Sequence, residues 1–345
     1  MHKPQIKFGK DFIFEKNFFL KLAKSIKNIQ LESGAIPSNK DSSHDPWDHI
    51  EAIMGLNFLE DKESADLGFQ WLKNNQNSDG SWYSKYLDNK PIELNKPTHF
   101  GPYISVAALH HFKIFSDKEK LNELWETIYS AVDFSVNLQN SNGTIPWSID
   151  RDDQIENDFL LTGSSSILKS IECAIKISRI IEKKEKKNWL KAYKSLAQAI
   201  QNPHGLFDKN QDRSRFSMDW YYPIISGALS QEEKDFYIKK IFKDFYIEGI
   251  GVKCVIEEPW VTVAETSEFI ISLVISNKIE DAKKILLEAM NISDSDYIPY
   301  MGWQYKENIF WPEEKPSWTS AALILAADSI YGFSDGSDIL IKNHL

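Results

Sequence analysis

Hydrophobic residues recur with a helical period along nearly the whole chain, and no long segment alternates as a strand would. Twelve segments show the helical pattern. They are expected at residues 16–30, 45–59, 64–76, 98–115, 121–139, 157–181, 187–202, 215–229, 231–248, 261–278, 279–292 and 316–330. The pattern therefore predicts an all-α protein.

The twelve segments alternate between two kinds. Segments such as 121–139 and 231–248 are amphipathic and rich in Lys and Glu, which is typical of helices with one face in water. Segments such as 98–115 and 316–330 are apolar nearly all round, which is typical of buried helices. Six outer–inner pairs that each bury one side are expected to close into a ring. Because no linker interrupts the pattern, we expect one (α/α)6 barrel domain over residues 1–345.

Short turns that contain glycine punctuate several of the predicted hairpins, as at 33–38 and 203–207. One of them completes the motif Gly68-x2-Trp71-Leu72-x3-Gln76-x2-Asp79-Gly80-Ser81-Trp82, and a weaker copy is Phe134-x4-Gln139-x3-Gly143-x3-Trp147. These motifs resemble the QW repeat of the squalene cyclase and prenyltransferase type of α–α toroid. The resemblance implies that they tie outer helices to the following turn, so it informs the fold rather than the chemistry.

Composition narrows the classes of partner. The net charge of −10 and the presence of only four Arg argue against a nucleic-acid or pyrophosphate partner. The two cysteines, Cys173 and Cys254, have no disulfide or zinc spacing, and no apolar run is long enough for a membrane span. We therefore expect a cytoplasmic protein without a cofactor. The sequence does not indicate its oligomeric state.

The 11 Trp, 13 Tyr and 20 Phe are many for this length, and stacked aromatic rings are used by both sugar-binding clefts and terpene pockets. Many of them lie where the inner segments begin, together with polar side chains. If all inner helices run the same way, these starts meet at one end of the barrel, which we call the mouth. The candidate substrate-binding residues there are Asp45, Trp47, His49, Glu51, His99, Tyr103, Trp220, Tyr221, Tyr222, Trp260, Thr262, Trp303, Trp311, Glu313 and Trp318.

Three carboxylates at the mouth are the candidate catalytic residues: Asp48, Glu265 and Asp219. Glu265 lies one turn into an otherwise apolar segment, where partial removal from water would suit a general acid. Each of the three also has a structural interpretation, as a helix cap, an ion-pair partner or a hydrogen-bonded core residue. Asp45, which precedes Pro46, fits a helix N-cap in particular.

Paired carboxylates with aromatic walls in a helical toroid favour cleavage of a glycosidic bond. Segments 35–56, 216–229, 251–266 and 311–330 resemble a bacterial group of toroid proteins that often carry a "prenyltransferase" label. This group is similar to the mycobacterial endo-mannosidases that trim methylated mannose polysaccharides. The resemblance implies an α-mannoside hydrolase, with an oligosaccharide or polysaccharide as its substrate.

Two other functions stay open from the sequence. An isoprenoid cyclase would use an Asp-x-Asp-Asp string, and Asp150-Arg151-Asp152-Asp153 matches that string, although an exposed acidic loop also explains it. A toroid that binds a carbohydrate or protein partner without catalysis would disperse its carboxylates over the rim. His44, His49 and His99 lack a recognised metal spacing, so no metal site is predicted.

Overall fold

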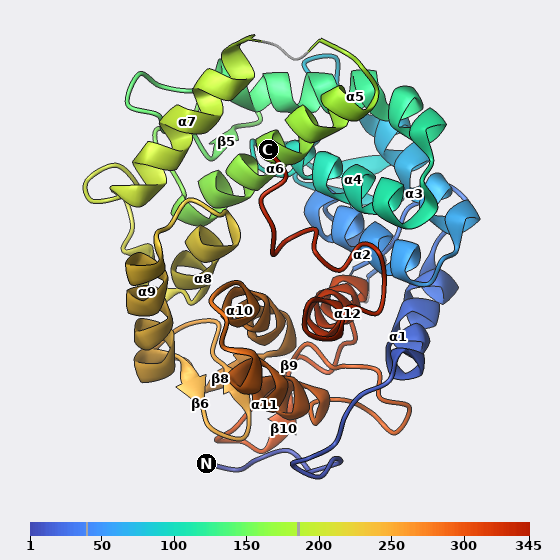
Figure 1. Ribbon diagram of the computed structural model, residues 1–345, viewed down its shortest axis with the longest axis vertical. Helices are drawn as coiled ribbons and strands as arrows, with labels where there is room; N and C mark the ends of the chain where they lie inside the picture. The colour runs from blue at the N-terminus through green and yellow to red at the C-terminus, as the bar shows by residue number, and fades with distance from the viewer. Residues whose placement is uncertain (39–40, 185–186) are drawn as a thin grey trace.

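Twelve α-helices form two concentric layers in the computed structural model, which describes residues 1–38, 41–184 and 187–345. The outer layer consists of α1 (Lys16–Ile29), α3 (Lys62–Asn75), α5 (Lys118–Asn137), α7 (Lys187–Gln201), α9 (Gln231–Asp244) and α11 (Ile279–Met290). The inner layer consists of α2 (Pro46–Phe58), α4 (Ile104–Phe115), α6 (Leu161–Ile180), α8 (Met218–Ile225), α10 (Val263–Ile275) and α12 (Ser317–Tyr331). Figure 1 shows the outer helices surrounding the inner ones.

The inner helices close into a ring. Each contacts the next one in chain order, and α12 contacts α2. Nearly every residue of α2 and α12 is buried, whereas α9 buries only Ile238 and Ile241. The predicted (α/α)6 barrel is confirmed, because helices that are apolar all round need protein on every side. Among the described residues, no helix is both long and apolar enough to cross a membrane.

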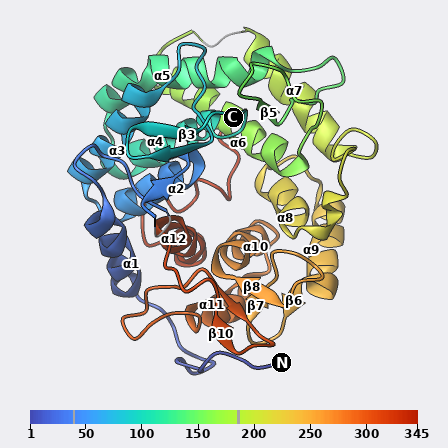
Figure 2. The same ribbon diagram turned by 180° about the vertical axis from the view of Figure 1, so that it is seen from behind.

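Within the described residues, ten short strands lie in the connections that lead from an outer helix to the next inner helix. They form two three-stranded sheets, in the orders β1-β2-β3 and β10-β9-β8, and the two pairs β4-β5 and β6-β7. Their bounds are β1 Ser43–His44, β2 Lys85–Leu87, β3 Lys90–Glu93, β4 Lys96–Pro97, β5 Ser148–Ile149, β6 Tyr246–Ile247, β7 Gly251–Val252, β8 Trp260–Thr262, β9 Gly302–Gln304 and β10 Ile309–Phe310. Strands of two to four residues are too short for alternation to show in the sequence. All these connections lie at the mouth, where the inner helices begin (Figure 2).

A glutamine at the end of an outer helix links successive hairpins. The amide of Gln76 donates to the carbonyl of Gly80 in its own turn and to that of Thr127 in α5, both at 3.0 Å. Gly80 has φ +91°, and an added Cβ would lie 2.2 Å from the carbonyl oxygen of Ser130, so only glycine fits. The indole N–H of Trp82 donates to the carbonyl of Leu72.

The same link recurs around the ring. Gln139 donates to Gly143 and Ala192, as the second motif predicts, and Gln30 donates to Gly34 and Ser64. Gln30 thus belongs to a third copy that lacks the tryptophans. These repeats act on the fold, because each one ties the end of one outer helix to the next outer helix.

A C-terminal segment (residues 332–345) follows α12 and covers the end of the ring opposite the mouth. Figure 1 shows it crossing the centre of the ring. Two residues of α6 hold it: buried Lys169 donates to the carbonyl of Lys342, and buried Glu172 accepts from the backbone N–H of His344. Leu340 is buried beneath the inner helices. The barrel is therefore closed at this end and opens at the mouth.

Candidate active site

Three carboxylates lie near the start of α2, at the N-cap and in the first two turns. Asp45 is the N-cap: its side chain accepts from the backbone N–H of Asp48 at 2.8 Å, and Pro46 takes the first helical position. The capping role expected for Asp45 is confirmed. Asp48 and Glu51 lie one turn apart on the same helix, so their side chains lie on the same side of it.

These carboxylates favour the protonated form. Removal from water raises the pKa of Asp48 well above its ordinary value, and the charges of Asp45 and Glu51 raise it further. Removal from water and the charge of Glu268 likewise raise the pKa of Glu51, although a hydrogen bond with the Trp47 side chain opposes the shift. For Asp45, burial raises the pKa to about 6.

Two glutamates of α10 complete this acidic cluster. Buried Glu265 has one side-chain oxygen, Oε2, without a hydrogen-bond partner in the described chain, and the thiol of Cys254 hydrogen-bonds to its carboxylate. Glu268, one turn further on, accepts hydrogen bonds from the hydroxyl groups of Tyr221 and Tyr222. Burial raises the pKa of Glu268 to about 8, against the opposing effect of the two tyrosines.

Glu268 was not predicted from the sequence. Its position three residues after Glu265 was a usable signal, because residues i and i+3 share a helix face. Its partners, Tyr221 and Tyr222, lie on α8, so the sequence does not show that they contact Glu268.

Aromatic side chains form the wall beside these carboxylates. The indole of Trp47 stacks on Tyr103, with ring centres 4.6 Å apart and planes at 19°. It meets His99 and Tyr222 edge to face, at 5.3 and 5.9 Å. Four elements (α2, the turn before α4, α8 and the loop at His99) thus contribute to one aromatic wall. Such a surface suits the apolar face of a sugar ring.

The carboxylates of α2 and α10 meet in the interior of the ring. Glu51, Glu268, Tyr103 and Tyr222 line a cavity of about 10 Å³, and Leu340 of the C-terminal segment closes it below. This space is enough for about one water molecule. The two helices are separated in the ring by α12 alone. Asp48 and Glu265 lie nearer the helix starts than Glu51 and Glu268, so the substrate side of the cluster faces the mouth.

Asp219, the third predicted carboxylate, lies on α8, which is opposite α2 in the ring. It accepts from the hydroxyl of Thr162, and its second oxygen has no partner among the described residues. Burial raises the pKa of Asp219 to about 6. Burial, reinforced by the charge of Asp219, raises the pKa of nearby Asp208 to about 7. Asp208, which the sequence analysis also missed, makes this a second acidic pair.

Comparison with known proteins shows the family. The chain is 32% identical over 318 residues to the "MMP endo-(1,4)-3-O-methyl-alpha-D-mannosidase" of Mycolicibacterium hassiacum, covering 92% of this chain and 87% of that protein. The chain belongs to the family of this endo-mannosidase. No family model matches it.

Solved structures share the fold of this endo-mannosidase family member at low identity. A glycosidase variant in complex with glucose has a TM-score of 0.72 at 12% identity, over 92% of this chain and 98% of that one. A D-mannose isomerase has a TM-score of 0.70 at 10% identity, over the same shares of the two chains. A sugar epimerase from a ruminal bacterium has a TM-score of 0.66 at 12% identity, over 91% and 97%. These neighbours give no support to the prenyltransferase label.

Several residues predicted to bind substrate lie in structural positions instead. Both ring nitrogens of buried His49 bond to the backbone, to the N–H of Ile36 and the carbonyl of Gly68. Trp303 is buried, and its indole N–H donates to the carbonyl of His2, which ties the N-terminal arm to the barrel. Thr262 lies at the start of α10; its backbone carbonyl accepts from the hydroxyl of Thr266, whereas its own hydroxyl has no partner among the described residues.

The remaining predicted residues lie at or near the rim. Trp220 donates to the carbonyl of Ser214 and packs on Tyr237. Trp260 and Trp311 contact each other beside the β8-β9-β10 sheet. Glu313 is exposed in the loop before α12, and Trp318 is half-buried in its first turn.

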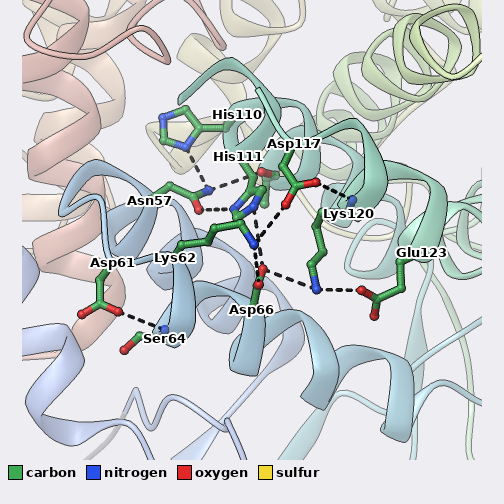
Figure 3. Close-up of polar contacts among 11 residues, drawn as sticks. Asn57, Asp61, Lys62, Ser64, Asp66, His110, His111, Asp117, Lys120 and Glu123 are labelled. Carbon is green, nitrogen blue, oxygen red and sulfur yellow. Dashed lines mark hydrogen bonds and ion pairs between the residues drawn. The ribbon is translucent and has the colours of Figure 1, made fainter. Parts of the chain in front are cut away.

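The histidines do not gather into a metal site. Among residues 1–38, 41–184 and 187–345, no group of three or more His, Cys, Asp or Glu could hold a metal ion. His110 and His111 lie at the end of the ring away from the mouth, where Figure 3 shows Asn57 between them. Asn57 is 3.3 Å from His110 Nδ1 and 2.8 Å from His111 Nδ1. Burial lowers the pKa of these imidazoles to about 3 and about 4, so both are neutral links between α2 and α4.

The acidic string Asp150-Arg151-Asp152-Asp153 lies in an exposed loop. Asp152 and Asp153 are exposed, and Asp153 forms an ion pair with Lys96 at 2.7 Å. A cyclase would need these carboxylates above a deep apolar cavity. The loop explanation of this string is therefore confirmed.

Proposed function

We propose that the protein hydrolyses α-mannosidic bonds in an oligosaccharide or polysaccharide. The observation that carries the proposal is the cluster of carboxylates that α2 and α10 bring together inside the ring, where they raise one another's pKa, beside an aromatic wall. Family membership supports the same reaction class, because the Mycolicibacterium hassiacum relative is named as an endo-mannosidase.

In this proposal Asp48 is the general acid. Its raised pKa favours the protonated form, which can give a proton to the glycosidic oxygen as the bond to the anomeric carbon breaks. The sequence suggested Glu265 as a suitable acid and left the assignment of acid and base open. Asp48 is favoured as the acid because burial, reinforced by the charges of Asp45 and Glu51, raises its pKa.

Glu265 is then the carboxylate that activates water. Its unpartnered Oε2 can accept a proton from the water that attacks the anomeric carbon. Tyr221 and Tyr222 donate hydrogen bonds to Glu268, which lies one turn after Glu265 on α10, and so hold this second carboxylate in a fixed position. The substrate is neutral, which agrees with the net charge of −10.

The test is a panel of α-mannosides, α-glucosides and isoprenoid diphosphates, assayed for new reducing ends and for released phosphate. We expect reducing ends from α-mannosides. Asp48→Asn and Glu265→Gln should each lower kcat by about 10²-fold or more, because each removes a proton-transfer group. Asp152→Asn is the matched control in the exposed loop, and it should keep wild-type activity. Wild-type turnover in both site variants, or loss of activity in Asp152→Asn, would refute this assignment.

A further inference from the structure

A groove of about 550 Å³ lies at the rim, along the β8-β9-β10 sheet and apart from the carboxylate cluster of α2 and α10. This volume is within the range of about 300–1,000 Å³ that is usual for small-molecule sites. Trp260, Ile309 and Trp311 form its apolar lining. Trp311 is 51% exposed and Ile309 is 46% exposed, so both side chains present apolar surface to solvent.

The two indoles are held in fixed positions. The ring centres of Trp260 and Trp311 are 5.2 Å apart with planes at 82°, which makes a right-angled corner. The indole N–H of Trp260 donates to the backbone carbonyl of Trp311 at 2.6 Å. Trp260 and Ile309 both pair with Gln304 in the sheet. A ligand therefore meets a preorganised aromatic corner, which lowers the entropy lost on binding.

Polar groups surround this corner. Glu258, Gln304 and Glu307 line the same groove. In the part of the chain that the structure describes, neither glutamate forms an ion pair, so both carboxylates can accept hydrogen bonds from hydroxyl groups. An indole face with adjacent hydrogen-bond acceptors is complementary to a sugar ring, whose C–H face is apolar and whose edge carries hydroxyl groups.

The groove lies close to the catalytic cluster along the chain, as two observations show. Trp260 precedes Glu265 by five residues, so their Cα atoms are at most about 17 Å apart. Val255, which also lines the groove, follows Cys254, whose thiol hydrogen-bonds to Glu265. A chain of sugars that is cleaved beside Glu265 can thus extend into the groove.

We propose that the groove at Trp260 and Trp311 is a distal subsite that binds a sugar unit of the same α-mannoside chain, away from the bond that is cleaved. This rests on the proposed function. The subsite makes chain length a determinant of the reaction, because only a long substrate can reach both the catalytic carboxylates and the groove.

The test compares a short and a long α-mannoside oligosaccharide with the wild type and Trp311→Ala. The ratio of kcat/KM for the long substrate to that for the short one should fall about tenfold in Trp311→Ala, mainly through KM, since stacking on one ring contributes up to roughly one factor of ten. Phe236→Ala is the matched control. Phe236 is 61% exposed on the outer helix α9, so its removal should leave the ratio at the wild-type value.

Binding gives a readout that does not depend on turnover. With Asp48→Asn as the background, the long oligosaccharide should change tryptophan fluorescence and bind about tenfold more weakly when Trp311→Ala is added. An unchanged length ratio together with unchanged binding would overturn the subsite while the hydrolase remains. A wild type that cleaves no α-mannoside would instead overturn the proposed function, whatever the binding result.

Discussion

Gly80 offers a sharp test of how the hairpins are joined. It has φ +91°, and a Cβ added there would lie 2.2 Å from the carbonyl oxygen of Ser130 in α5. Gly80→Ala must therefore push the turn away from α5. The movement also disrupts the hydrogen bonds from Gln76 to Gly80 and Thr127.

The cost follows from three contributions. An L-residue in left-handed backbone costs about 1–2 kcal/mol. Overpacking against a backbone carbonyl adds about 1–3 kcal/mol, and weakened hydrogen bonds add about 1 kcal/mol. We expect Gly80→Ala to lower the free energy of unfolding by about 3–6 kcal/mol.

Gly205 is the matched control, because it lies in the corresponding turn after α7. It has φ +70°, and nothing lies within 4 Å of an added Cβ. Gly205→Ala should therefore cost only about 1 kcal/mol, from the backbone alone. Urea unfolding followed by circular dichroism measures both variants. If both variants lost the same free energy of unfolding, the reasoning would be refuted, because the contact with Ser130 would then contribute nothing to the difference.

Three further predictions concern buried groups. Trp82→Ala should destabilise the protein by about 3–5 kcal/mol, because a large buried ring and its hydrogen bond to Leu72 are lost; a near wild-type thermal melt would contradict this. Glu51→Gln should raise the free energy of unfolding at pH 8 but not at pH 4. Because the pKa of Glu51 is raised in the folded protein, its ionisation destabilises the fold only above the pKa that it has in the unfolded chain, and this destabilisation grows as pH rises. A gain in stability at both pH values would contradict this reasoning. Glu172→Leu should destabilise the protein by about 3 kcal/mol, because it leaves buried Lys169 without its ion-pair partner. Adding Lys169→Met should recover much of the lost stability, and denaturant unfolding of the single and double variants measures both effects.

The two layers of helices could be predicted because the pattern of apolar and polar residues in each helix shows whether it is buried. The apolar surface around α12 and the single apolar face of α9 are local properties, so they place one helix inside and the other outside. The strands could not be predicted, since pairs such as Trp260 with Gln304 join residues far apart in the chain and span only a few positions. The C-terminal segment shows no period, and contacts with α6 hold it in place.

The site was predictable only in part. Asp48 and Glu265 stand out because they are charged residues in segments that are otherwise apolar. Glu268 did not stand out, because its two tyrosine partners come from another helix and only the folded ring connects them. His49 shows the opposite case. It lies in the same polar cluster as Asp48 in the sequence, but its ring points to the backbone of the next hairpin.

The contact between α12 and α2 has a consequence for biosynthesis. The first hairpin leaves the ribosome long before the last one, and until then α2 has an apolar side with nothing to cover it. Residues 332–345, which hold the base of the barrel, are synthesised after all twelve described helices. The nascent chain therefore remains an open arc, with apolar surface exposed to association with other chains, until α12 and this segment have been made.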